Sequence, residues 1–446
     1  MTAGARVSMP AAGAPAPPAA PARVATFAAL RERNYRLYFW GAVISNIGTW
    51  MQRIAQDWLV LELTRSPFAV GVTMALQFLP LMLFGLYGGV VADRYEKRRL
   101  LFVTQAVMGL LAAGLAVVTL AGAVAVWHVY AVAFLLGLVT VVDNPARQVF
   151  VNELVPARLV RNAVSLNSGS FQLARLVGPA VAGVMIAASG SGWAFAVNAV
   201  SFLAMIAALL RIDPRLMQAV PRAARQSGQI REGLRYVWAR PELKWLIALV
   251  FFIGTFGFNF AIILSAYAKL TFASTASLYG WLNATLAVGS LAGALLAARR
   301  ATVRLGFLFT VAALFSLSML ILGFVRAVPL FMLLLAPCGM LAIGFNAMAN
   351  ATVQLSTDAQ VRGRVMSLYM LVLAGGTPLG ATFIGGVTEL WGAPAAMWVS
   401  GAICLLATVA CAVGAAREAG IRVHFAPRNL GERWFVIERP EEHEGP

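Results

Sequence analysis

Four residues of one apolar stretch near the N-terminus combine the side chains that a polar path through a membrane requires. Asn46, Trp50, Arg53 and Asp57 are spaced by four, three and four residues within the apolar run 37–61. In a helix this spacing places them on one face. An ionised side chain in lipid must face the bundle interior or a wet cavity. The face is therefore expected to bind substrate or to carry a coupling proton; the alternative is an Arg53–Asp57 ion pair that only holds the helix in place.

The composition indicates that lipid surrounds most of the chain that positions these residues. Of its 446 residues, 60% are hydrophobic and 12% are charged, whereas a soluble domain is about 25% charged. The chain is expected to form an all-α integral membrane protein with twelve transmembrane helices of about 20 residues each. The apolar runs fall at about 37–61, 68–91, 100–120, 127–143, 165–187, 193–210, 243–266, 278–298, 305–325, 329–346, 367–387 and 394–414.

The basic residues predict how the chain lies across the membrane. The loops on one side hold 30 of the 35 Lys and Arg residues, and those on the other side hold only Arg65, Lys269 and Arg326. Cytoplasmic loops carry the excess of bases, so both termini are predicted to be cytoplasmic in a multi-pass protein of the plasma membrane. The net charge of +17 is thus spread over separate loops, which argues against a nucleic-acid partner.

Motifs of catalysis are not found in the sequence. It contains no phosphate-binding G-x-x-x-x-G-K-[ST] loop, and its three histidines are isolated. Cys338, Cys404 and Cys411 lie in apolar runs without the spacing of metal ligands, so they are expected to be packing residues. We expect neither an enzyme nor a metal or other cofactor.

The two halves of the chain resemble each other weakly. A shift of 202 residues aligns Asn144 with Asn346, Gly178 with Gly380 and Gly183 with Gly385. Parallel six-helix repeats around a midplane site are one architecture of secondary transporters, so we predict two pseudo-symmetric six-helix bundles. The predicted division is a disordered cytoplasmic tail at 1–33, bundles at 34–211 and 243–415, a cytoplasmic loop at 212–242, and a cytoplasmic tail at 416–446.

A basic, aromatic segment ends the central loop. Arg231–Trp245 has bases and aromatic residues at helical spacing. It is predicted to form an amphipathic helix on the inner leaflet, where its bases would meet anionic lipid. A docking site for a partner protein is the alternative.

The charged hairpin between the second and third apolar runs reads GVVADRYEKRRLL from Gly89. Glycine, three residues, Asp-Arg and a basic cluster resemble the signature loop of major facilitator superfamily transporters. The resemblance implies that Asp93, Lys97 and Asp143 latch the two halves when the cytoplasmic side is closed. Lys97 stands where the family usually has Arg, and a Lys forms weaker ion pairs with carboxylates because it cannot bind them in a bidentate way. The gate motif comprises Gly89, Asp93, Arg94, Lys97, Arg98 and Asp143; for Arg98 the alternative role is topology and lipid contact.

The fifth apolar run contains RLVGPAVAG from Arg175. Within this stretch, Gly178, Pro179 and Gly183 resemble the antiporter motif that marks exporters within this superfamily. Pro179 removes a backbone donor and kinks the helix, while small residues permit close helix approach. A general small-residue packing seam is the alternative.

Longer stretches resemble one branch of the superfamily, the bacterial transmembrane secretion effectors, which is similar to siderophore exporters and macrolide efflux proteins. They are RNYRL from Arg33, IGTWMQ from Ile47, SPFAVG from Ser66, DNPAR from Asp143 and AVSLNSGSFQLARLVGP from Ala163.

This resemblance covers about 30–415 and implies alternating access with proton-coupled efflux, by antiport, of a small amphipathic drug or siderophore. Asn259 and Asn346 would then face the cavity. The expected partners are a small-molecule substrate, protons and membrane lipid, and the expected state is a monomer. An importer, a lipid or lysophospholipid transporter and a non-transporting scaffold remain alternatives.

Overall fold

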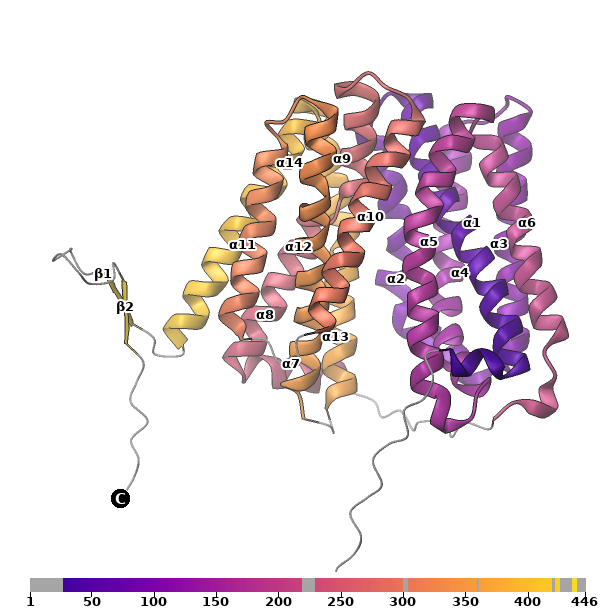
Figure 1. The fold of residues 1–446 in the computed structure, drawn as a ribbon, viewed down its shortest axis with the longest axis horizontal. Coiled ribbons are helices and arrows are strands. Elements are labelled where there is room, and N and C mark those ends of the chain that lie inside the picture. Colours follow the sequence, from indigo (N-terminus) through magenta and orange to yellow (C-terminus); the bar gives the residue numbers. More distant parts are fainter. Residues whose placement is uncertain are drawn as a thin grey trace, which may run out of the picture.

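Two groups of helices stand side by side in the computed structural model (Figure 1). The structure describes residues 27–218, 229–299, 304–358 and 361–418, together with the backbone of two short strands. The first group comprises α1 (Arg33–Thr64), α2 (Pro67–Arg94), α3 (Lys97–Leu120), α4 (Val126–Glu153), α5 (Val160–Ser189) and α6 (Ser191–Arg211). The second comprises α8 (Pro241–Phe252), α9 (Phe260–Ala266), α10 (Ala276–Ala298), α11 (Leu305–Leu322), α12 (Val328–Leu355), α13 (Arg362–Gly375) and α14 (Thr377–Glu418), with π-helical turns at Ile253–Gly257 and Tyr267–Thr271.

Twelve membrane crossings follow from these helices. Among the described residues, ten segments are long and apolar enough to cross a membrane. One of them, Arg362–Glu418, has 57 residues and holds two crossings, because the chain turns at Gly392, whose φ is 83°. The remaining crossing is α1, which has 32 residues and a polar face that lowers its hydropathy. The predicted all-α fold with twelve transmembrane helices in two bundles is confirmed.

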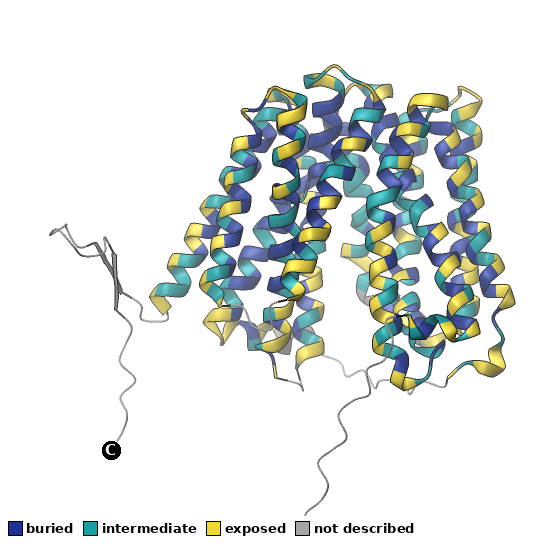
Figure 2. Cartoon of the chain, viewed as in Figure 1, coloured by how far each residue is buried: buried dark blue, intermediate teal, exposed yellow. Residues whose placement is uncertain are grey.

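The outer faces of both groups are apolar, as lipid contact requires. Figure 2 shows exposed residues along the outward sides of the helices. They include Leu110, Leu333 and Leu406, each about 70% exposed. A soluble protein rarely leaves so much apolar surface in water, so these sides fit the hydrocarbon of a bilayer.

Glycines let the helices within each group approach closely. Gly88 of α2 lies against the backbone carbonyl of Val141 in α4. Pro145 lacks the N–H that would otherwise bond to that carbonyl. The contact between α2 and α4 therefore covers a carbonyl that has no helical hydrogen-bond donor. In the second group Gly293 of α10 lies against the carbonyl of Met340 in α12. The two groups therefore use the same kind of contact in corresponding helices.

The two groups meet near the C-terminal ends of α1 and α5 and the turn at Gly392 within α14, opposite the base-rich loops. This side is here called the base-poor end. Gly183 of α5 packs on Gly280 of α10, and Gly385 of α14 packs on Gly71 of α2. Gly183 and Gly385 are also the pair that the internal repeat aligns. One contact type is thus used twice, once on each side of the interface.

The predicted amphipathic helix is shorter than expected. The structure forms α7 (Gln229–Trp238) and then begins α8 at Pro241. The helix ends before Pro241 because a proline disfavours helical backbone in the residue before it. The hydroxyl of Tyr236 in α7 accepts from the backbone N–H of Asp358 (3.1 Å), and Arg240, just after α7, forms an ion pair with Asp358 (3.0 Å). α7 is therefore tied to the second group.

The C-terminal segment contains two short strands, β1 (Arg422–Phe425) and β2 (Phe435–Glu438), which pair antiparallel. They lie beyond the last membrane crossing. The sequence patterns predicted no strand in the tail at 416–446.

Candidate substrate cavity

A cavity of about 340 Å³ lies between the two groups. This volume falls in the lower part of the range typical of small-molecule sites. Both groups line it: α1, α2 and α5 from the first, and α10, α12, α13, the start of α14 and the chain around α9 from the second. Its apolar lining includes Met74, Phe78, Phe258, Phe260, Leu286, Ile343 and Leu373.

Two arginines lie at the ring of one tryptophan in this cavity. The guanidinium carbon of Arg53 is 4.9 Å from the ring centroid of Trp50, and that of Arg175 is 5.7 Å from the same ring. Trp50 is held from behind, since its Cβ lies close to Gly178 and its ring meets the edge of Phe171 at 5.7 Å. The first group therefore presents a fixed pair of cations to the cavity.

Neither arginine has a carboxylate within ion-pair distance among the described residues. Ion pairs there do not include Arg53 or Arg175, and the buried Nε of Arg53 has no hydrogen-bond partner. A cation–π contact contributes about 0.5–2 kcal/mol. The ring of Trp50 is therefore a weak partner for these cations, and both side chains are partly exposed in the cavity. Their charges are accessible to a ligand there.

Asp57 joins the two groups at the base-poor end of the cavity. The hydroxyl of Tyr279 in α10 donates to Oδ2 of Asp57 (3.1 Å). The ring of Tyr279 also stacks on Trp58 at 6.2 Å. Arg53 and Asp57 both line the cavity, but no nitrogen–oxygen distance between them reaches ion-pair range in the described structure. The alternative of a purely structural Arg53–Asp57 pair is therefore not supported.

The three asparagines that were predicted to face the cavity differ in their positions. Asn346 lines it, and its Oδ1 accepts from the hydroxyl of Tyr369 (2.8 Å). Asn259 is buried, donates to the carbonyl of Thr255 (2.7 Å) and is not among the lining residues, so its role in the cavity stays a prediction. Its amide is used one turn back along its own chain, where the backbone changes from a π-turn to α9. Asn46 is likewise not among the lining residues.

The antiporter-like residues of α5 face two ways. Arg175 and Pro179 line the cavity. Gly178 packs on α1 of its own group, whereas Gly183 packs on Gly280 of the other group. The stretch is therefore both a cavity wall and part of the interface between the groups. Its role in antiport stays a prediction.

The gate residues lie at the base-rich end of α2 and α3. Gly89 is buried in α2, Arg94 is exposed, and the side chain of Asp93 lies outside the described residues. Lys97 is buried and donates to the carbonyl of Tyr95 (3.3 Å).

Arg98 has a structural contact that the sequence did not reveal. Its Nε donates to the carbonyl of Leu209 (2.7 Å) and its second guanidinium nitrogen to that of Leu210 (3.2 Å). These carbonyls belong to the last turn of α6, where a cation is favourable. Arg98 thus ties α3 to α6, beyond the topological role considered for it.

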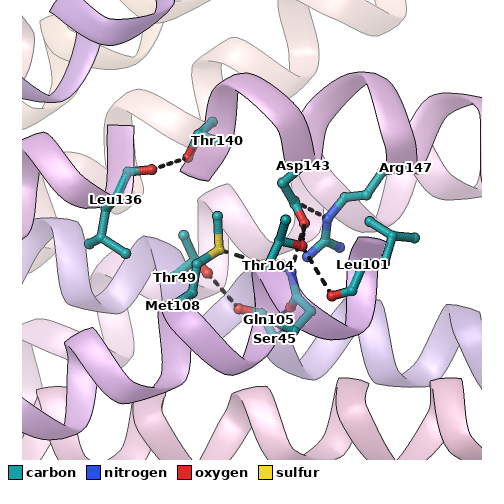
Figure 3. A network of polar contacts seen from close by, with 10 residues as sticks. All are labelled: Ser45, Thr49, Leu101, Thr104, Gln105, Met108, Leu136, Thr140, Asp143 and Arg147. Atoms are coloured by element: carbon teal, nitrogen blue, oxygen red, sulfur yellow. Dashed lines mark hydrogen bonds and ion pairs between the residues drawn. The ribbon is translucent and has the colours of Figure 1, made fainter. Parts of the chain in front are cut away.

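Asp143 lies inside the first group, within α4. It was expected at the end of its span, but α4 continues to Glu153. Its Oδ2 accepts from Nε of Arg147 (2.5 Å), and its Oδ1 accepts from Thr104 (2.6 Å) and Gln105 (2.9 Å), as Figure 3 shows. Arg147 is therefore its partner in this state, and no ion pair with Lys97 is formed between these two described residues.

Three residues with structural partners in the cavity, the gate region or the interface were not predicted from the sequence. Tyr279 pairs with Asp57 and Arg147 with Asp143. Glu389 in α14 accepts from the hydroxyl of Ser66 and from the backbone N–H of Phe68 (3.1 Å) in α2. For Arg147, the i, i+4 spacing from Asp143 was a usable signal. Tyr279 and Glu389 act across the two halves, and no spacing within one helix reveals such pairs.

Metal binding finds no support in the described part of the chain, where no group of three or more His, Cys, Asp and Glu side chains could hold an ion. The charged residues that line the cavity are two arginines and one aspartate. The arrangement suits binding of a small molecule rather than covalent chemistry.

The chain belongs to the transmembrane secretion effector family of major facilitator superfamily transporters, whose family model matches residues 24–428. It is 23% identical to the staphyloferrin A transporter of Staphylococcus aureus over 364 residues, covering 80% of this chain and 90% of the relative. It is 27% identical to the multidrug efflux pump Tap of Mycolicibacterium fortuitum over 374 residues, covering 80% and 89%. The protein is thus a membrane transporter of the major facilitator superfamily rather than an enzyme.

Solved structures support the fold. A bacterial homologue of the human lysosomal transporter Spinster, in an inward-facing and unoccupied conformation, has a TM-score of 0.68 at 13% identity. The match covers 86% of this chain and 95% of that protein. At this identity the likeness concerns the fold alone.

Proposed function

We propose that this protein exports a small amphipathic molecule across the plasma membrane by alternating access, in exchange for protons. The observation that carries the proposal is the cavity between the two groups, in which Arg53, Asp57 and Arg175 meet an otherwise largely apolar lining. Ionisable residues inside a membrane mark substrate and proton pathways. The efflux activities named for Tap-type pumps favour export over import.

The base-rich end is assigned to the cytoplasm by its excess of Lys and Arg. In this orientation the structure represents a state closed toward the outside. Four hydrogen bonds join the two groups at the base-poor end: Ser66 to Glu389, Phe68 to Glu389, Ser277 to Gly183 and Tyr279 to Asp57. Asp57 would be the residue that takes up the proton, since it is the carboxylate in the cavity lining.

Asp57→Asn is expected to keep substrate exchange and to lose the response to a proton gradient. Asparagine retains an acceptor for Tyr279 but cannot carry a proton. The measurement uses everted membrane vesicles from a host without its own major efflux pumps. Uptake of a compound found in a substrate screen is followed with and without a protonophore. Glu62→Gln is the matched control, because Glu62 is an exposed carboxylate near the same end of α1.

Unchanged gradient-driven uptake in Asp57→Asn would remove Asp57 from coupling. Uptake that the protonophore does not affect in the wild-type protein would remove proton antiport. A scaffold predicts no transport of any compound, and a solute importer predicts accumulation by intact cells instead of by everted vesicles.

Tyr279→Phe is expected to favour states that are open at the base-poor end. It removes the hydrogen bond to Asp57 and keeps the ring that stacks on Trp58. A hydrogen bond to a charged group contributes about 1.5–3 kcal/mol, so the ratio of open to closed states should rise about tenfold or more. Labelling of Thr73→Cys in the cavity by a membrane-impermeant maleimide measures this ratio. The native cysteines are buried and, unlike Thr73, do not line the cavity. An unchanged labelling rate would show that the bond does not hold this end closed.

A further inference from the structure

The cavity carries more positive than negative charge. Its charged lining residues are Arg53, Arg175 and Asp57, which leaves one positive charge in excess when all three are ionised. Asp57 is engaged by Tyr279 of the other group. Neither guanidinium has a carboxylate within ion-pair distance among the described residues. The charge that the protein itself does not balance is therefore positive.

The two cations are also held in position. Both guanidiniums lie near the single ring of Trp50, which Gly178 and Phe171 fix from the side of α5. The buried Nε–H of Arg53 has no acceptor. An arginine offers several donors in a planar fork that matches carboxylate and phosphate oxygens. A carboxylate or similar oxyanion placed here would supply both the missing acceptor and the missing charge.

From this geometry we infer that the transported molecule is an amphipathic anion, whose acidic group binds between Arg53 and Arg175 while its apolar part lies against the aromatic lining. The inference rests on the proposed transport function and adds the substrate class. One negative group brings the cavity to zero net charge while Asp57 is ionised. In a low-dielectric interior, occluding a substrate costs less free energy when its charge and the charges of the cavity sum to zero. A cationic substrate would meet two guanidiniums and a single carboxylate that is already bonded to Tyr279.

The test compares three aromatic probes with the purified protein in phosphatidylcholine nanodiscs. Anilinonaphthalene sulfonate is an anion, phenylnaphthylamine is its neutral counterpart without the sulfonate, and ethidium is a cation. Binding is measured by fluorescence above that of empty nanodiscs. We expect saturable binding of the anion, about tenfold or more tighter than that of the neutral probe, since hydrogen bonds to a charged group should account for at least that factor.

Variants assign this preference to the two arginines. Arg53→Gln and Arg175→Gln should each weaken the anion about tenfold and leave the neutral probe unchanged, whereas Arg53→Lys should retain most of the preference. Arg215→Gln is the control for loss of one positive charge, because Arg215 is exposed outside the cavity. Unchanged binding of the neutral probe also shows that a variant is folded.

Equal binding of the anionic and neutral probes, tighter binding of ethidium, or binding of none of the three would overturn the inference. A preference for the anion that survives both glutamine substitutions would overturn it as well. Failure of the proposed transport function has a different result: the anion would bind saturably through the arginines, yet no gradient would drive its movement in vesicles.

Discussion

Gly280→Val is expected to abolish transport in a protein that still folds. A Cβ at position 280 would lie 2.7 Å from the Cα of Gly183 and 2.8 Å from the carbonyl oxygen of Pro179. These are backbone atoms of α5, so they cannot rotate out of the way as a flexible side chain would. The two groups could then not approach at the base-poor end, and the state closed toward the outside would be lost. Because alternating access needs that state, both gradient-driven uptake and substrate exchange should fall to the level of empty vesicles.

Two measurements separate this effect from misfolding. Gly169→Val is the matched control, since Gly169 lies in α5 and a Cβ there would meet nothing within 4 Å. It introduces the same β-branched residue into a helix without a steric conflict. Thr73→Cys combined with Gly280→Val should be labelled faster from outside than Thr73→Cys alone. Normal transport by Gly280→Val would mean that the α5–α10 contact does not form in the working cycle.

The sequence predicted the fold because the membrane imposes strong rules on it. Apolar runs of about 20 residues, separated by loops with one-sided basic charge, identify crossings without tertiary information. The Gly183–Gly385 match of the internal repeat corresponds in the structure to the two glycine contacts between the groups. The split between α7 and α8 was predictable from Pro241, but the basic and aromatic periodicity of Arg231–Trp245 outweighed that signal.

The cavity was only partly predictable. Helical spacing brought Trp50, Arg53 and Asp57 to one face, and the structure places that face at the cavity. Which helix lies opposite is decided by packing between the halves, so Tyr279 could not be identified. Asn259 shows the converse difficulty. A polar residue in an apolar run can satisfy its own backbone one turn away, and its residue type alone does not distinguish that role from substrate contact.

Asp143→Leu is expected to cause a large loss of stability in the first group. Asp143 is 3% exposed and holds Arg147, Thr104 and Gln105 together by three hydrogen bonds (Figure 3). Removing one partner of a buried ion pair costs about 3–5 kcal/mol, because the remaining charge is left uncompensated. The leucine also leaves the hydroxyl of Thr104 and the amide of Gln105 without this acceptor. The temperature at which the purified protein aggregates, followed by size-exclusion chromatography, should fall clearly.

The double variant Asp143→Leu with Arg147→Met tests the physical reason. If the cost comes from the Arg147 guanidinium that is left without its carboxylate, removing that charge as well should restore much of the stability. Apolar replacement of a whole buried ion pair often changes the stability little. Glu96→Gln is the control for loss of an acid from a pair at the surface, because Glu96 and its partner Arg99 are largely exposed. It should change stability by less than about 1 kcal/mol. A double variant no more stable than Asp143→Leu would instead assign the loss to Thr104 and Gln105 of α3, whose hydrogen bonds to Asp143 join α3 to α4. The ion pair within α4 would then contribute little.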